Sequence, residues 1–201
     1  MSGNYPHHGT EPYGTWSFGP HSQFRKNQRS IAETLRNAEY GRAIFGKWHV
    51  GAKVSPNGRM LNRETIISQV GDDWSPPLVD GPGDLGFDHS YIVPQGIQAP
   101  PYTFFRDDYI AMNASDAIMW KVGEYDKPNY KGTSMIRDGF PGKSNPKWDS
   151  SAFDMTLVDE TKTFVEDHIK KSPMIPFLPM LHLVQSIFLI LLRMFTLTTR
   201  R

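Results

Sequence analysis

The sequence has no cysteine among its 201 residues, and its charge is nearly balanced, with 22 Lys and Arg against 21 Asp and Glu. The lack of cysteine excludes disulfides, zinc-thiolate sites and a catalytic thiol made from this chain. The net charge of +1, without a dense Lys/Arg block, argues against a nucleic-acid partner. The 38% hydrophobic and 12% aromatic content is still enough for a packed globular core.

Long hydrophobic runs are also scarce, apart from Met174–Leu192, which is uncharged and about as long as the roughly 20 residues that cross a bilayer. Pro176, Pro179, His182 and Gln185 interrupt this run. A buried strand followed by an apolar tail is therefore favoured over a membrane span. The first residues, MSGNYPHHGTEPYG, lack the basic start and apolar centre of a secretory signal, so no export address is expected and the localisation stays open.

A short helix followed by a buried strand is predicted after residue 30. Ser30 and Glu33 have capping-box spacing, and Ile31, Leu35 and Ala38 follow on one helical face. The apolar run of residues 42–45 then predicts a strand that ends at a glycine, residue 46. Residues 47–49 would therefore lie at the C-terminal end of a strand, where open α/β sheets bind ligands.

A second helix and strand are predicted near the C-terminus, after a long stretch rich in Gly, Pro, Asp and Asn. Asp149 and Ser150 offer N-caps, apolar residues recur at helical spacing up to Ile169, and Pro173 blocks continuation. Residues 175–184 then read as a buried strand. The order of helices, strands and loops predicts an α/β fold. In the intervening loops, the adjacent acids Asp107 and Asp108 are expected to be solvated.

Lys47 and His49 are the residues that suggest chemistry. They are two positions apart, so in an extended backbone their side chains would point the same way and converge on one ligand. A lysine supplies a compact positive charge, and an imidazole can hold or donate a proton to a leaving oxygen. The pair suits an oxyanion ester, although by spacing alone a solvated rim around one packed tryptophan is the commoner outcome.

The surrounding residues closely resemble the sulfatase family. Residues 34–51, TLRNAEYGRAIFGKWHVG, resemble a family stretch of the form TLKEAGYRTAxxGKWHLG. Further matches lie on both sides of this stretch in the family's order, and together the matches are spread across about nine tenths of the chain. They comprise SGNYPHHG at 2–9, LGFD at 85–88, Val-Pro at 93–94, Pro-Pro-Tyr at 100–102, and the helix and strand at 154–177.

The resemblance implies an alkaline-phosphatase-like α/β fold, here a partial sulfatase sandwich with helices around a mixed sheet. It implies arylsulfatase-like hydrolysis of a sulfuric ester around a bound calcium, with a formylglycine nucleophile made from the cysteine of a CxPSR motif. The substrate would be a small sulfate ester or a sulfated glycan, and such proteins are usually exported. By position, Lys47 matches the sulfate-contacting lysine and His49 the histidine that assists formylglycine turnover.

Several family features are missing from this chain. With no cysteine there is no CxPSR motif and no formylglycine, and the calcium ligands are largely absent, so no metal ligand is assigned here. Gly96 replaces a substrate-contacting serine, and Gln185 replaces the leaving-group histidine. His182 matches that histidine's non-catalytic neighbour, so both His182 and Gln185 are uncertain site residues.

These departures predict an incomplete sulfatase portion that is not competent alone, with a partial N-terminal domain at 1–186 and a divergent apolar tail at 187–201. Two alternatives remain open at this point. One is a phosphodiesterase or phosphonate hydrolase of the same superfamily. The other is a non-catalytic remnant that binds an anion or a partner, or is tethered to a membrane.

Overall fold

The computed structural model describes residues 2–3, 5, 9–10, 22–52, 74–97, 100–120, 142–183 and 187–188. These residues form an α/β fold with a mixed sheet, as predicted from the sequence. The helices and strands of the fold are α1 (Ile31–Arg36), β1 (Gly41–Lys47), β2 (His89–Val93), β3 (Phe105–Arg106), β4 (Tyr109–Ile110), η3 (Ala114–Asp116), β5 (Ile118–Trp120), β6 (Gly142–Ser144), η5 (Ser150–Ala152), α3 (Phe153–Lys171), β7 (Phe177–His182) and β8 (Ile187–Phe188).

The main sheet has the order β4-β3-β2-β1-β7-β8. Strand β1 pairs in parallel with both β2 and β7, whereas the remaining neighbours are antiparallel. A separate two-stranded sheet pairs β5 with β6. Because β1, β2 and β7 are parallel, their C-terminal ends lie together at one edge of the sheet.

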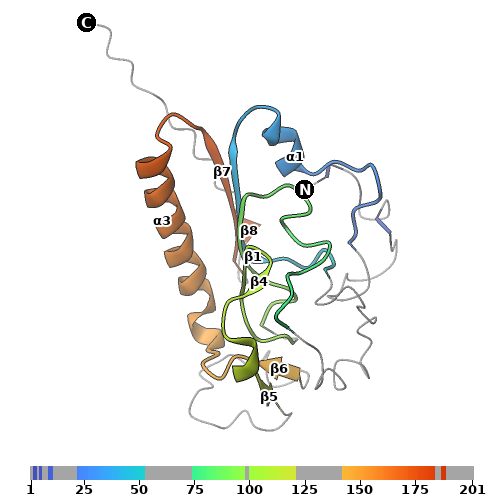
Figure 1. Ribbon diagram of the computed structural model, residues 1–201, viewed down its shortest axis with the longest axis vertical. Helices are drawn as coiled ribbons and strands as arrows, with labels where there is room; N and C mark the ends of the chain where they lie inside the picture. Colours follow the sequence, from blue (N-terminus) through green and yellow to red (C-terminus); the bar gives the residue numbers. More distant parts are fainter. Residues whose placement is uncertain are drawn as a thin grey trace, which may run out of the picture.

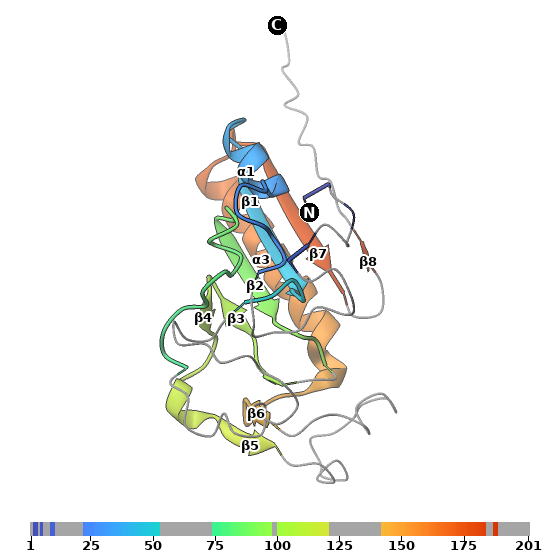
Figure 2. The ribbon, with the colours of Figure 1, turned by 90° about the vertical axis from the view of Figure 1, so that its right-hand side faces the viewer.

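Helix α3 covers one face of the sheet, packing on β1 and β7, while α1 and the irregular segments lie on the other face (Figures 1 and 2). Alternate residues of β1 enter two cores: Ala43 and Phe45 join Phe153 and Leu157 of α3, and Ile44 joins a cluster with Ala32 of α1. A parallel strand covered on both faces reads as a continuous apolar run, which explains residues 43–45.

The predicted capping box is confirmed at α1. The Ser30 hydroxyl accepts a hydrogen bond from the Glu33 amide at 3.0 Å, and the Glu33 carboxylate accepts one from the Ser30 amide at 3.0 Å. The same hydroxyl donates to the Leu85 carbonyl, which fixes the loop before β2 to the helix start. The prediction that Ala38 continues the apolar face is wrong, because α1 ends at Arg36 and Ala38 lies exposed in the following turn.

Two other local predictions are also corrected. Strand β1 does not end before residue 46 but continues through Gly46 to Lys47. The start of α3 has no side-chain cap, because the 3-10 turn η5 precedes it and the Ala152 amide bonds to the Asp149 carbonyl. The helix nevertheless ends before Pro173 as predicted, and its last turn contains Lys170 and Lys171.

The C-terminal strand is shorter than predicted: β7 begins at Phe177, and Ile175 is 46% exposed. Among the described residues, no helix is both long and apolar enough to span a membrane. The predicted domain boundary at residue 186 lies outside the described residues and stays a prediction. Just beyond it, Ile187 pairs with His182 through the backbone.

The LGFD segment at 85–88 ties β2 to β1. Gly86 has a φ of 93°, and a Cβ there would lie 3.1 Å from the Glu33 backbone nitrogen, so a side chain would clash with α1. Asp88 accepts a hydrogen bond from the Arg42 amide at 3.0 Å and forms an ion pair with the Arg42 guanidinium. The Arg42 side chain is only 9% exposed, so its charge depends on this partner.

The hairpin between β3 and β4 turns at Asp107 and Asp108, with positive φ values of 50° and 68°. A two-residue hairpin loop of type I′ needs positive φ at both central positions, and aspartate tolerates this conformation. The expectation that both acids are solvated is wrong for Asp108, whose carboxylate accepts from the Gly83 amide at 3.0 Å and whose Oδ1 is buried without a hydrogen-bond partner among the described residues. Burial, together with the charges of Asp84 and Asp107, raises the pKa of Asp108 to about 6.

We expect Asp88→Asn to lower the free energy of unfolding by about 1–3 kcal/mol, because it leaves the Arg42 charge nearly buried without a counter-charge. Urea titration followed by circular dichroism measures the change. Asp167→Asn is the matched control, since it removes the acid of the exposed Asp167–Lys171 pair and should leave the unfolding midpoint unchanged. Equal effects of the two variants would contradict this role for Asp88.

We expect Asp108 to make stability depend on pH between about 4 and 6. The carboxyl is protonated in both states below its unfolded pKa of 3.8, but between 3.8 and about 6 the unfolded chain releases the proton more readily. The free energy of unfolding therefore falls as the pH rises through this window. Above the window the loss of stability has reached its full size. Partial exposure screens the effect, so its size is on the order of 1 kcal/mol.

The variant Asp108→Asn removes this titration while keeping an acceptor for the Gly83 amide. The thermal unfolding midpoint of the variant minus that of the unmodified chain should therefore be larger at pH 7 than at pH 4. A difference between the two chains that is the same at both pH values would show that Asp108 does not titrate in this window.

Candidate functional site

The candidate site lies at the C-terminal edge of the parallel strands, where β1 ends. Lys47 is the last residue of β1 and pairs with Val93, the last residue of β2. Beyond the strands, the Trp48 amide donates to the Val93 carbonyl at 2.9 Å, and the His49 amide donates to the Pro94 carbonyl at 2.9 Å. The two chains therefore stay joined past the sheet and hold residues 47–49 at this edge.

Trp48 anchors the segment between the two polar residues. Its indole is 3% exposed and lies edge-on to Phe87, with ring centroids 6.4 Å apart. The indole nitrogen donates to the Gly51 carbonyl at 2.9 Å, which closes a tight loop after β1. The predicted packed tryptophan is thus present, and Lys47 and His49 flank it as half-buried residues.

The backbone at His49 is not extended as the sequence argument assumed, since its φ is 51°. The expected same-side orientation of Lys47 and His49 through strand geometry is therefore wrong, although both residues do lie at the predicted edge. A non-glycine residue with positive φ is uncommon and needs support from its surroundings. Here the hydrogen bond from the His49 amide to Pro94 supplies part of that support.

Partial burial lowers the pKa of the Lys47 ammonium. Removal of water from an ammonium group disfavours its charged form, and it also strengthens the attraction of that charge for an anion. Lys47 therefore has the position and the chemistry expected of an oxyanion contact.

The two uncertain residues are placed only in part. The backbone of His182 ends β7 opposite Gly46, so this residue reaches the same edge as Lys47 and His49. Gln185 lies outside the described residues. Gly96, two positions beyond the Val93-Pro94 pair, is buried and has a φ of 100°.

Metal binding has no support in the described part of the chain, which contains no cluster of three or more His, Asp or Glu side chains able to hold an ion. Calcium prefers six or more oxygen ligands. The described residues therefore do not fit a calcium site by themselves.

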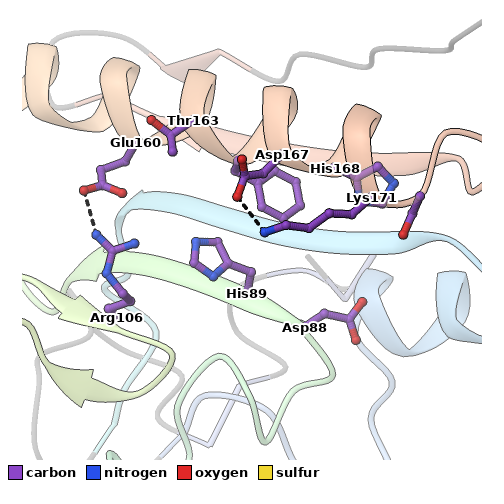
Figure 3. Close-up of a pocket in the computed structure, with 10 residues that line it drawn as sticks. Asp88, His89, Arg106, Glu160, Thr163, Asp167, His168 and Lys171 are labelled. Atoms are coloured by element: carbon purple, nitrogen blue, oxygen red, sulfur yellow. Dashed lines mark hydrogen bonds and ion pairs between the residues drawn. The ribbon is translucent and has the colours of Figure 1, made fainter.

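A second concave region, which the sequence reasoning missed, lies between α3 and strands β2 and β3 (Figure 3). Its volume is about 400 Å³, and its lining includes His89 at the start of β2 and His168 near the end of α3. It therefore lies at the N-terminal end of β2, opposite the edge that carries Lys47. No sequence motif could have indicated it, because its residues come from β2, β3 and α3 and their ends, and those of α3 lie more than 50 positions further along the chain than those of the two strands.

The charged side chains around this pocket are bound to one another. Arg106 pairs with Glu160 at 2.6 Å, and Lys171 with Asp167 at 2.7 Å. His89 Nδ1 lies 2.8 Å from Asp107, and burial, which raises the pKa of Asp107, is outweighed by hydrogen bonds from His89 and Ser90 that lower it. The pocket is thus a groove whose lining includes paired charges, and the edge with Lys47 remains the better candidate for an anion site.

Comparison with known proteins gives a relative in both sequence and fold. The chain is 22% identical over 166 residues to an N-acetylgalactosamine-6-O-sulfatase of Bacteroides thetaiotaomicron, covering 72% of this chain and 30% of that protein. A solved sulfatase structure, described as belonging to a core genetic locus for glycosaminoglycan metabolism in Bacteroides thetaiotaomicron, superposes with a TM-score of 0.61 at 17% identity. That match covers 89% of this chain and 38% of the solved one.

No protein-family model matches the chain, so the individual motifs carry no independent support. The chain spans only about a third of the length of either relative. The chain is therefore similar in sequence to one sulfatase and shares the α/β fold of a solved one.

Proposed function

We propose that this chain carries the anion-binding part of a sulfuric ester hydrolase, in which Lys47 contacts the sulfate group and His49 handles a proton at the ester oxygen. The observation that carries the proposal is the end of β1. This strand lies between two parallel neighbours, and it delivers both residues to the edge of the sheet where α/β proteins bind ligands.

The chemistry of the two residues supports these two roles, contact with the sulfate group by Lys47 and proton transfer by His49. A partly desolvated ammonium attracts a sulfate oxygen more strongly than a solvated one, and it can neutralise charge that gathers on the sulfuryl group. The imidazole of His49, carried two positions further along the same segment, is suited to give a proton to the departing alcohol oxygen near neutral pH. The anchored Trp48 holds the segment between them, so the backbone of residues 47–49 is already ordered before a ligand binds.

The substrate class follows from the relative. Because that protein is an N-acetylgalactosamine-6-O-sulfatase, we propose a sulfated glycan as the ligand, with a small sulfate ester as its simplest mimic. The 201 residues contain no cysteine from which a formylglycine could be made. We therefore propose that this chain binds sulfate esters without turning them over.

Two alternatives lead to other experimental outcomes. Binding of phosphate diesters with no binding of sulfate esters would indicate a phosphodiesterase-like or phosphonate hydrolase-like site, but neither relative is of that kind. Absence of any saturable anion binding would leave a non-catalytic remnant that binds a partner or is tethered to a membrane.

We expect Lys47→Ala to weaken binding of phenyl sulfate at least tenfold, because a charge-assisted contact to the anion is lost. The affinity is measured by isothermal titration calorimetry or by NMR titration of the full chain. Lys171→Ala is the matched control, since Lys171 is an exposed lysine paired with Asp167 at the other end of the molecule. Equal losses in both variants would mean that only net charge matters.

We expect the affinity of the unmodified chain for phenyl sulfate to fall as the pH rises towards the Lys47 pKa. Because burial lowers that pKa, the fall should begin at a lower pH than an ordinary lysine gives. The measurement is the dissociation constant between pH 7 and pH 10. An affinity that stays constant over this range would exclude a titrating lysine from the contact.

A further inference from the structure

A buried donor without a partner lies directly beside the candidate site. The side chain of Gln95 is in the turn after β2, and the residue is only 9% exposed. Its amide nitrogen, Nε2, is inaccessible to solvent and has no hydrogen-bond partner among the described residues. A primary amide offers two N–H donors, so this nitrogen has unused bonding capacity.

Such an arrangement is costly unless something compensates for it. A buried donor that makes no hydrogen bond loses its interaction with water and gains nothing in return, and most buried polar groups in proteins therefore have partners. An apolar residue of similar size, such as leucine, would fill the same space without that cost. The presence of glutamine at this position therefore needs a partner from outside the described residues.

The backbone of Gln95 lies next to the segment that carries the candidate site. It follows Pro94, whose carbonyl accepts the His49 amide at 2.9 Å, and Pro94 follows Val93, the residue paired with Lys47. The backbone on one side of Gln95 is thus joined directly to the segment that carries both site residues. On its other side, Gly96 with a φ of 100° turns the chain back towards the fold.

We propose that Gln95 is a further ligand-contacting residue of this site, whose side-chain amide donates a hydrogen bond to an oxygen of the sulfuryl group held by Lys47. This assignment rests on the proposed function. A sulfate ester has three non-bridging oxygens, so one lysine leaves acceptors available for a neutral donor. Because neighbouring atoms cover Nε2, the contact requires rotation about the terminal torsion of the glutamine, which is broad and soft.

The direct test is an NMR titration of the ¹⁵N-labelled full chain with phenyl sulfate. The side-chain NH₂ signals of Gln95, assigned by their loss in Gln95→Leu, should shift and saturate together with binding. The NH₂ signals of Gln28 are the internal control, because Gln28 lies before α1 and already donates to the Ser2 hydroxyl at 3.1 Å. Gln95 signals that stay in place while phenyl sulfate binds would overturn the proposal.

Two substitutions test the same contact by affinity. Gln95→Leu should weaken phenyl sulfate binding about tenfold while the unfolding midpoint stays the same or rises, because an unsatisfied donor is removed. Gln95→Glu should weaken binding further, since it places a carboxylate against the anion. Gln28→Glu is the matched control for the added charge and should leave the affinity within about twofold, because Gln28 is a half-buried residue before α1 and not at the end of β1 or β2.

The outcomes separate the two proposals. If Lys47→Ala weakens binding but both Gln95 variants bind like the unmodified chain, the role of Gln95 is refuted and the proposed function stands. If the unmodified chain shows no saturable binding of phenyl sulfate, the proposed function fails and the assignment of Gln95 fails with it.

Discussion

The parallel pairing of β1 with β2 and β7 is the constraint on which the rest of the described structure depends. Both faces of β1 are covered, one by α3 and the other by the cluster around α1, so its residues are apolar from 43 to 45. The charged residues of this strand, Arg42 and Lys47, lie towards its two ends. The same pairing that builds the core therefore fixes where Lys47 is placed, and backbone hydrogen bonds from Trp48 and His49 to the end of β2 extend that control by two residues.

The two ends of the parallel strands have different electrostatic character. At the N-terminal end, charges are matched: Arg42 binds Asp88, Arg106 binds Glu160, and the carboxylate of Asp107 lies against His89. Such pairs hold the start of β2 against β1 and α3, and they leave little net field for an ion. At the C-terminal end, the described polar groups include a partly buried lysine and an orphaned amide donor, both of which favour an acceptor.

The sequence was sufficient for features that depend on local chemistry. The capping box needs only Ser30 and Glu33 three positions apart, and the apolar run before Lys47 identifies a strand covered on both faces. The edge of the sheet that carries the site follows from strand direction once β1 is recognised. The sulfatase-like fold likewise agrees with the resemblance of the residues around Lys47 and His49.

Features that depend on contacts between distant segments could not be read from the sequence. The φ of His49 depends on the Pro94 carbonyl 45 residues away, and the pocket beside α3 depends on ion pairs such as Arg106–Glu160. The buried Asp108 looked like a solvated acid because its cover comes from the loop at Gly81 and Gly83. The predicted N-cap of α3 was wrong for another reason. Several residues could have capped the helix, and a 3-10 turn precedes it instead.

Trp48 separates the two residues proposed to meet the ligand, and it is the most deeply buried of the three. Its indole is fixed by Phe87 on one side and by the Gly51 carbonyl on the other. The spacing between the ammonium and the imidazole is therefore set by a side chain that touches no ligand. In this arrangement, packing in the hydrophobic core determines where the polar residues of the site are held. Changes in packing around Phe87 would therefore move Lys47 and His49 at the sheet edge.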